Sequence, residues 1–176
     1  MLTSTLDNGS TQYAWYAPEQ VTVVGEEYQT SGDPYKTENY LTTITNGVKT
    51  TVITRQQTGL PAHTITRVEN ANTTTITKGT GDEAIIRTIN KNYLGNNVME
   101  TIESVSRASD TTPASCTRKI ELRTDGGWVI LEQTEGYSSD VAQTTKYEYD
   151  SHFRVSRIKY HNGGYIRYEY DSEGRE

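Results

Sequence analysis

The chain has 176 residues, of which 32% are hydrophobic and 23% charged, and its formal net charge is −6. An acidic balance does not favour nucleic-acid binding. The sequence also has no apolar run near the roughly 18 residues that predict a membrane-spanning helix, so membrane insertion is not expected either. Residues 1–15 lack the basic and apolar regions of a secretory signal peptide.

Tyrosine dominates the aromatic content, with 13 Tyr against one Phe and two Trp. Together with many Val, Ile and Thr residues, this composition favours β-strands over disorder. Since a Tyr can bury its ring while its hydroxyl stays in water, we expect a thin sheet with two partly solvated faces. The predicted fold class is all-β, an antiparallel meander of repeated β-hairpins that forms a long twisted or coiled strip of sheet.

The N-terminal residues 1–39 are expected to form a β segment, and whether this segment belongs to a repeat array is left open. Residues 40–146 are expected to form degenerate, lengthened hairpins. Within them, residues 82–89 could form a short helix capped by Asp82, but their β-branched content favours a strand.

Two hairpins are predicted in the first half of the chain. Residues 40–45 and 48–54 flank Asn46-Gly47, a pair that accepts the positive φ angles of a type I′ turn. Residues 63–68 and 73–77 flank a second turn at residues 70–72.

A third hairpin is predicted to turn at Asp125-Gly126, between strands at residues 119–123 and 128–132. A two-residue loop pairs Leu122 with Val129 and Ile120 with Leu131. The four apolar side chains are then expected to share one face.

A fourth hairpin is predicted at residues 156–170. The three-residue loop Asn162-Gly163-Gly164 is favoured because it places compatible side chains opposite each other. The expected pairs on one face are Tyr160 with Ile166, Ile158 with Tyr168, and Ser156 with Tyr170. On the other face Arg157 is expected opposite Glu169, and Lys159 opposite Arg167.

One phrase occurs twice near the C-terminus. Tyr-Glu-Tyr-Asp-Ser occupies residues 147–151 and again residues 168–172, an interval of 168 − 147 = 21 residues. Asp150 and Asp171 are predicted to open turns, because an Asp carboxylate accepts hydrogen bonds from backbone N–H groups two residues on. Gly174 is expected to be left-handed in the second turn. Phe153 replaces it in the first, which must therefore turn differently or carry strain.

The pattern Tyr-x-Tyr-Asp-x-x-Gly-Arg resembles the YD repeat, also called the Rhs-type repeat. The second copy matches fully, at Tyr168, Tyr170, Asp171, Gly174 and Arg175. The first matches without the Gly, at Tyr147, Tyr149, Asp150 and Arg154. Residues 147–176 are therefore assigned to clear YD repeats that stop within a repeat. The segments around Gly59, Gly95 and Gly127 resemble degenerate versions of the same turn.

This resemblance implies a β scaffold or shell wall in a large bacterial protein that is secreted or lies at the cell surface. It implies that the chain is a piece of a longer one, whose remaining repeats are its main partner. Because shells of this family also enclose toxins, a shell fragment of a polymorphic toxin is an alternative. Self-association through an unpaired edge strand is also expected.

Exposed aromatic rings suggest a function of a different class, a module that binds carbohydrate or a host surface. Trp15, Trp128 and Tyr165 are the candidates for stacking on such a ligand, since aromatic faces beside basic groups can bind sugars.

The sequence offers no catalytic constellation, so the chain is expected not to be an enzyme and to need no cofactor. His63, His152 and His161 lack metal-ligand spacing with one another or with Cys116. Cys116 is the single cysteine, which excludes an internal disulfide and leaves the role of its thiol open.

Overall fold

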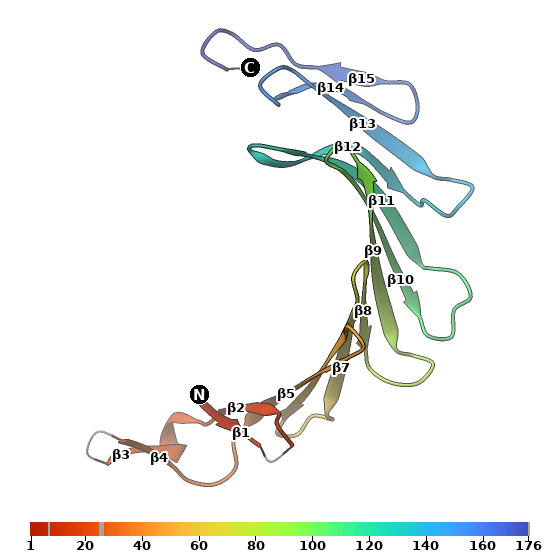
Figure 1. Ribbon diagram of the computed structural model, residues 1–176. Coiled ribbons are helices and arrows are strands. Elements are labelled where there is room, and N and C mark those ends of the chain that lie inside the picture. The colour runs from red at the N-terminus through yellow and green to blue at the C-terminus, as the bar shows by residue number, and fades with distance from the viewer. Residues whose placement is uncertain (7, 25–26, 176) are drawn as a thin grey trace. The chain divides into compact units, whose positions relative to one another are not determined.

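The computed structural model describes residues 1–6, 8–24 and 27–175. The chain divides into two compact units, Met1–Ile86 and Arg87–Glu176. Both consist of antiparallel strands joined by turns (Figure 1), which confirms the predicted all-β hairpin meander. Within the described ranges the helical structure is one 3-10 turn, η1 (Pro18–Gln20), and no helix there is long and apolar enough to cross a membrane.

The first unit is a six-stranded meander with a small hairpin inserted into it. The meander has the order β1 (Leu2–Thr5), β2 (Thr11–Trp15), β5 (Lys36–Thr45), β6 (Val48–Gln57), β7 (His63–Glu69) and β8 (Thr73–Lys78). The inserted hairpin consists of β3 (Val21–Val24) and β4 (Glu27–Thr30).

The turns of the first two predicted hairpins are confirmed. Thr45 pairs with Val48, so Asn46 and Gly47 form a two-residue loop, and their φ angles of 50° and 78° are those of a type I′ turn. The β7–β8 turn is held by Asn70, whose Oδ1 accepts hydrogen bonds from the backbone N–H groups of the second and third residues after it.

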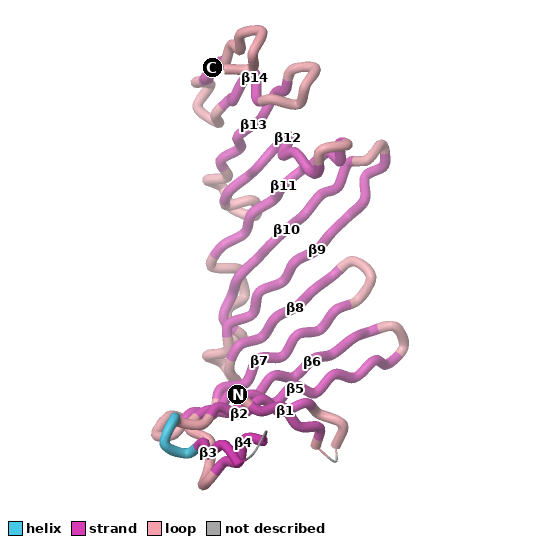
Figure 2. The backbone as a smooth tube through the Cα atoms, turned by 90° about the vertical axis from the view of Figure 1, so that its left-hand side faces the viewer, coloured by secondary structure: helices cyan, strands magenta, loops and turns pink. Residues whose placement is uncertain are grey.

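The second unit is a meander in simple chain order, in which neighbouring strands lie side by side as one layer (Figure 2). Its strands are β9 (Ile85–Gly95), β10 (Val98–Arg107), β11 (Ser115–Thr124), β12 (Gly127–Glu135), β13 (Gln143–Tyr149), β14 (Val155–Lys159) and β15 (Tyr165–Arg167). The strand β9 begins at Ile85, so the preference for a strand over a helix at residues 82–89 is confirmed from that residue on. The predicted segment boundaries at 39/40 and 146/147 fall inside β5 and β13.

Neither unit has a deep core, in agreement with the expected thin sheet. Among the described residues, the buried hydrophobic side chains are those of Ala14, Ala84 and Cys116, and no large side chain is fully buried. A single sheet layer can only half-bury its side chains against strand neighbours. Stability therefore depends on cross-strand pairs and backbone ladders rather than on a packed interior.

The predicted register of the third hairpin is right at its tip and wrong farther along. Leu122 pairs with Val129, but a bulge follows and Ile120 pairs with Glu132 instead of Leu131. The extra residue moves Glu132 onto the face of Arg118, where the two side chains form an ion pair of 2.9 Å. At the tip, the positive φ (123°) belongs to Gly127 rather than to Asp125 or Gly126.

The predicted register of the fourth hairpin is wrong by two residues. Ile158 pairs with Ile166 and Arg157 with Arg167, while Tyr160 donates its backbone N–H to the carbonyl of Gly164 (2.8 Å). The loop is therefore residues 161–163, with positive φ at Gly163 (84°) and a hydrogen bond from Gly164 N to Asn162 Oδ1 (3.0 Å). A slip of two residues keeps every side chain on its predicted face and changes only its partner.

Candidate functional site

The first of the two repeated turns is closed by the carboxylate of Asp150. Its Oδ1 accepts hydrogen bonds from the backbone N–H groups of His152 (2.8 Å) and Arg154 (3.0 Å), and its Oδ2 accepts one from Arg154 Nε (2.7 Å). The bond from the Arg154 backbone is the main reason why the pKa of Asp150 lies below its ordinary value. A carboxylate held this way stays ionised and acts as a structural acceptor.

The second turn repeats this bonding. Asp171 Oδ1 accepts from the backbone N–H groups of Glu173 and Arg175 (both 2.9 Å), and Oδ2 accepts from Arg175 Nε (2.8 Å). Gly174 has φ of 80° and Phe153, at the same place in the first turn, has φ of 58°. Of the two outcomes expected for the copy without Gly, the structure has the strained one, since Phe153 adopts the left-handed conformation and the turn is preserved.

The two copies contact each other through an arginine and a tyrosine. The guanidinium of Arg154 lies 4.3 Å from the ring centroid of Tyr170. A Cβ at Gly174 would lie 3.1 Å from Arg154 Nη1, so the Gly leaves room for this guanidinium.

The second Tyr of each copy bonds to the backbone of an earlier strand, β12 for Tyr149 and β14 for Tyr170. Tyr149 donates its hydroxyl to the carbonyl of Ile130 (2.7 Å), and Tyr170 donates to that of Val155 (2.8 Å). The first Tyr of each copy, Tyr147 or Tyr168, is half-buried.

The candidates for ligand stacking lie on different strands. Trp15 is on β2, half-buried, with Lys36 Nζ 4.3 Å from its ring centroid and Tyr13 beside it at 6.4 Å. Trp128, at the start of β12, is 45% exposed, and Tyr165, on β15, is 65% exposed with the Arg157 guanidinium 5.4 Å from its ring centroid. The structure thus leaves Trp128 and Tyr165 accessible and covers one side of Trp15 with its own cation.

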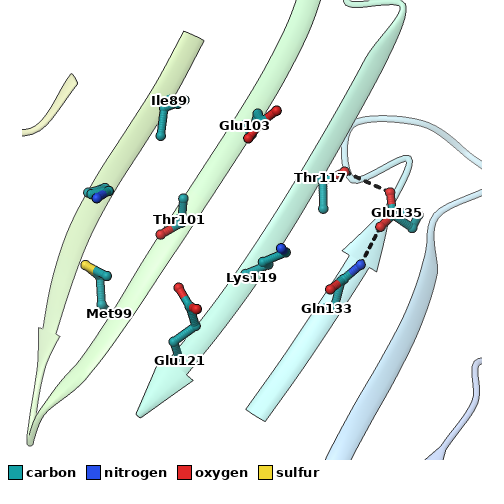
Figure 3. Close-up of a pocket in the computed structure, with 10 residues that line it drawn as sticks. Ile89, Met99, Thr101, Glu103, Thr117, Lys119, Glu121, Gln133 and Glu135 are labelled. Carbon is teal, nitrogen blue, oxygen red and sulfur yellow. Dashed lines mark hydrogen bonds between the residues drawn. The ribbon is translucent and has the colours of Figure 1, made fainter. Parts of the chain in front are cut away.

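A shallow pocket of about 430 Å³ lies on one face of β9 to β12 in the second unit (Figure 3). Its floor includes Ile89 and Met99, and its charged side chains are Lys91, Glu103, Lys119, Glu121 and Glu135. The Glu135 carboxylate accepts hydrogen bonds from Thr117 Oγ1 (2.8 Å) and Gln133 Nε2 (2.6 Å), which lower the pKa of Glu135. An anchored carboxylate of low pKa is a poor general acid at neutral pH.

The opposite face of the same strands carries a row of ionic and polar contacts. Arg118 on β11 binds Glu100 on β10 (2.6 Å) and Glu132 on β12 (2.9 Å). The row continues to Asn92 on β9, which donates to Glu100 (3.0 Å), and to Lys146 on β13, which lies 3.4 Å from Glu132. The pKa of Glu100 is lowered, first by the bond from Asn92 and then by the bond from Arg118. No pattern in the sequence indicates this row, because finding it requires the register across five strands.

The histidines and the cysteine are not assembled into a reactive site by any contact within the described ranges. Cys116 is buried and His152 is exposed. The Ser151 hydroxyl lies 3.4 Å from His152 Nδ1, a long distance for an oxygen–nitrogen hydrogen bond between adjacent turn residues. In residues 1–6, 8–24 and 27–175, no group of three or more His, Cys, Asp or Glu side chains could hold a metal ion.

Comparison with known proteins does not add a family to these observations. No family model, curated protein or solved structure matches the chain.

Proposed function

We propose that this chain is a non-catalytic β-repeat scaffold segment of a large bacterial protein that is secreted or lies at the cell surface. The observation that carries the proposal is the matched pair of turns at Asp150 and Asp171, together with the contact between Arg154 of one copy and Tyr170 of the next. Identical local bonding and a contact from copy to copy are what a repeat needs to stack on its neighbour.

The chemistry of the second unit also supports a structural role. Its carboxylates at Glu100, Glu135, Asp150 and Asp171 have lowered pKa values because each accepts several hydrogen bonds. Such groups hold strands and turns together, whereas catalytic acids need pKa values near the working pH.

Two other functions remain as weaker proposals. A shell around a polymorphic toxin would use the same scaffold, so it differs from the main proposal in the cargo and not in the repeats. A binding module built on Trp15, Trp128 and Tyr165 is less well supported, because these rings lie on three separate strands and Trp15 is partly covered.

The test is the location of the protein in its source cells and its lack of turnover. An antibody raised against the purified chain should label intact, unpermeabilised cells or their culture medium. The purified chain should hydrolyse generic ester, peptide, glycoside and phosphate substrates no faster than a heat-denatured sample. Labelling only after permeabilisation would contradict the proposed location, and reproducible turnover would contradict the non-catalytic role.

A further inference from the structure

The first unit contains a pocket that the scaffold role does not use. It has a volume of about 550 Å³, within the roughly 300–1,000 Å³ of small-molecule sites. Its floor is made by Gln12 on β2, Thr37 and Asn39 on β5, and Gln56 on β6. Gln12 is the cross-strand neighbour of Asn39, and Thr37 of Gln56, so two polar pairs from three strands face the same space.

Two tyrosines, an acid and Thr58 form the rest of the polar wall. Tyr16 follows β2, and Asp33 and Tyr35 come from the segment that leads into β5. Tyr35 is 43% exposed, so its ring is accessible to a ligand. An aromatic ring beside amides and a carboxylate combines an apolar surface with directional hydrogen-bonding groups.

Four polar side chains of this pocket have no partner of their own. In the described part of the chain, Gln12, Asp33, Thr37 and Gln56 make no side-chain hydrogen bond or ion pair. This contrasts with the pocket of Figure 3, where Glu103 and Glu135 are held by neighbouring side chains.

Asn39 carries a further polar atom without a partner. Its Oδ1 is buried and has no hydrogen-bond partner among the described residues. A buried acceptor without a donor is unfavourable, because it has given up its hydrogen bonds to water. Asn39 lines the pocket, and the terminal torsion of an Asn side chain is broad, so rotation of its amide can turn a polar atom toward a ligand hydroxyl group.

The rim of the pocket is held in place before any ligand binds. Gln20 Nε2 donates to the carbonyls of Ser31 (3.2 Å) and Asp33 (2.8 Å). The backbone of Tyr35 is bonded on both sides, to the carbonyl of Trp15 and to the N–H of Thr58 (both 2.9 Å). A rim fixed in this way loses little conformational freedom on binding.

The lining determines the class of ligand. Of the described residues around the pocket, none is Lys, Arg or His, and the one charged side chain is Asp33. A phosphate or an acidic polysaccharide would therefore meet no cation. We infer that this pocket binds a neutral saccharide. The hydroxyl groups of the sugar would form hydrogen bonds with the side chains of Gln12, Asp33, Asn39 and Gln56, and one face of the sugar ring would stack on Tyr35.

The full chain should be tested by saturation-transfer NMR with neutral hexasaccharides (maltohexaose, cellohexaose, mannohexaose) and with a heparin hexasaccharide as the anionic arm. At least one neutral sugar should receive saturation. Tyr35→Ala removes the ring but keeps both backbone bonds, and it should raise the Kd about tenfold or more, as expected for loss of one aromatic contact. Gln56 is exposed, and its side chain makes no hydrogen bond to the described residues, so Gln56→Ala should weaken binding with little risk to folding.

The matched control is Tyr165→Ala, which removes an exposed Tyr of the second unit and should leave the Kd unchanged. Circular dichroism and urea midpoints establish that each variant is folded. The inference is overturned if no neutral hexasaccharide binds, if only the heparin sugar binds, or if binding survives both pocket substitutions. It is also overturned if Tyr165→Ala abolishes binding, because the saccharide would then lie at the other candidate site. None of these outcomes bears on the scaffold proposal, whose test is location and lack of turnover.

Discussion

At the scale of single residues, the main feature is an Asp that organises each repeated turn. Asp150 and Asp171 each accept two backbone hydrogen bonds and one from the guanidinium of the Arg four residues on. The two turns differ at two positions, His152 against Glu173 and Phe153 against Gly174, and the second difference falls on the residue with positive φ. A left-handed conformation costs a non-glycine residue about 1–2 kcal/mol, so the first turn carries a strain that the second lacks.

Phe153→Gly is expected to stabilise the protein. Relief of the backbone strain contributes more free energy than is lost through the greater conformational entropy of Gly in the unfolded chain. The free energy of unfolding should therefore rise by about 0.5–1 kcal/mol. The Phe153 ring is 50% exposed, so its loss removes little burial. Urea unfolding measures the change. Gly174→Ala is the opposite control and should destabilise, and a lower midpoint for Phe153→Gly would show that its ring contacts outweigh the strain.

The same turn predicts a defined pH dependence. The folded pKa of Asp150 is lowered, chiefly by the backbone bond from Arg154, so its stabilising contribution is present above the unfolded pKa and is lost as pH falls through the folded one. Asp150→Asn should therefore lower the urea midpoint at neutral pH, and the difference from wild type should shrink in acid. Asp140→Asn, at an exposed residue, is the control and should leave the urea midpoint unchanged both at neutral pH and in acid. A difference that stays constant with pH would contradict the role of the charge.

At the scale of elements, strand pairing in the second unit is set by side chains that meet across strands. Arg118 lies between Glu100 and Glu132, and their side chains are 21%, 14% and 22% exposed. Arg87 and Glu103 form a comparable pair at 2.8 Å, but with exposed fractions of 48% and 38%. Desolvation makes the first contact the more consequential of the two.

Arg118→Gln should lower the free energy of unfolding by about 1–3 kcal/mol, because two partly buried carboxylates lose their cation. The matched substitution Arg87→Gln breaks an exposed pair and should cost less than about 0.5 kcal/mol. Urea unfolding at neutral pH provides both values. Equal effects would mean that burial does not distinguish the two contacts.

The β14–β15 register can be tested with a cross-strand disulfide in a Cys116→Ala background. Lys159 lies directly opposite Tyr165. The adjacent 160/164 and 158/166 pairs occupy the hydrogen-bonded positions, so 159/165 is a non-hydrogen-bonded pair. The Cα atoms of such a pair are typically about 4.5 Å apart, which lies within the range that a disulfide can bridge. Lys159→Cys with Tyr165→Cys should oxidise readily, whereas Lys159→Cys with Arg167→Cys should not. Peptide mapping under oxidising conditions distinguishes the two, and the reverse result would restore the register predicted from the sequence.

At the scale of the whole molecule, the main property is the lack of a deep core in either unit. With Ala14, Ala84 and Cys116 as the buried hydrophobic residues among those described, each strand is stabilised mainly by its two neighbours. Stability in such a one-dimensional arrangement is distributed and falls toward the edges. Within the second unit β15 has three residues, all exposed, and one strand neighbour in the sheet.

The rate of hydrogen exchange should therefore differ from strand to strand rather than be uniform. We expect β11 to exchange slowest in the second unit, because both of its edges are paired over eight residue pairs or more, and β15 to exchange fastest. Hydrogen–deuterium exchange with peptide-level mass spectrometry measures this order. A single common rate for β11 and β15 would indicate cooperative unfolding of the whole unit and contradict the graded view.

The sequence by itself determined the fold class, the chain positions of the hairpins and the chemistry of the turns. These follow from interactions a few residues apart, such as the positive φ angles of Asn46-Gly47 and the reach of Asp150 and Asp171 to the next backbone N–H groups. The two registers that were predicted wrongly depend on a bulge and on a choice between similar loops, which the turn residues alone do not settle. The bulge opposite Ile120 brings Glu132 to Arg118, and the Asn162 side chain selects among loops of similar length.

Only the tertiary structure decided where polar side chains without hydrogen-bond partners lie together. The pocket of Gln12, Asn39 and Gln56 joins three strands and a rim segment held by Gln20, and no local pattern marks these residues as neighbours. The row through Arg118 likewise exists only once five strands are in register. In a β-sheet, residues distant in sequence become neighbours through pairing, and a shift of one residue moves each side chain to the other face.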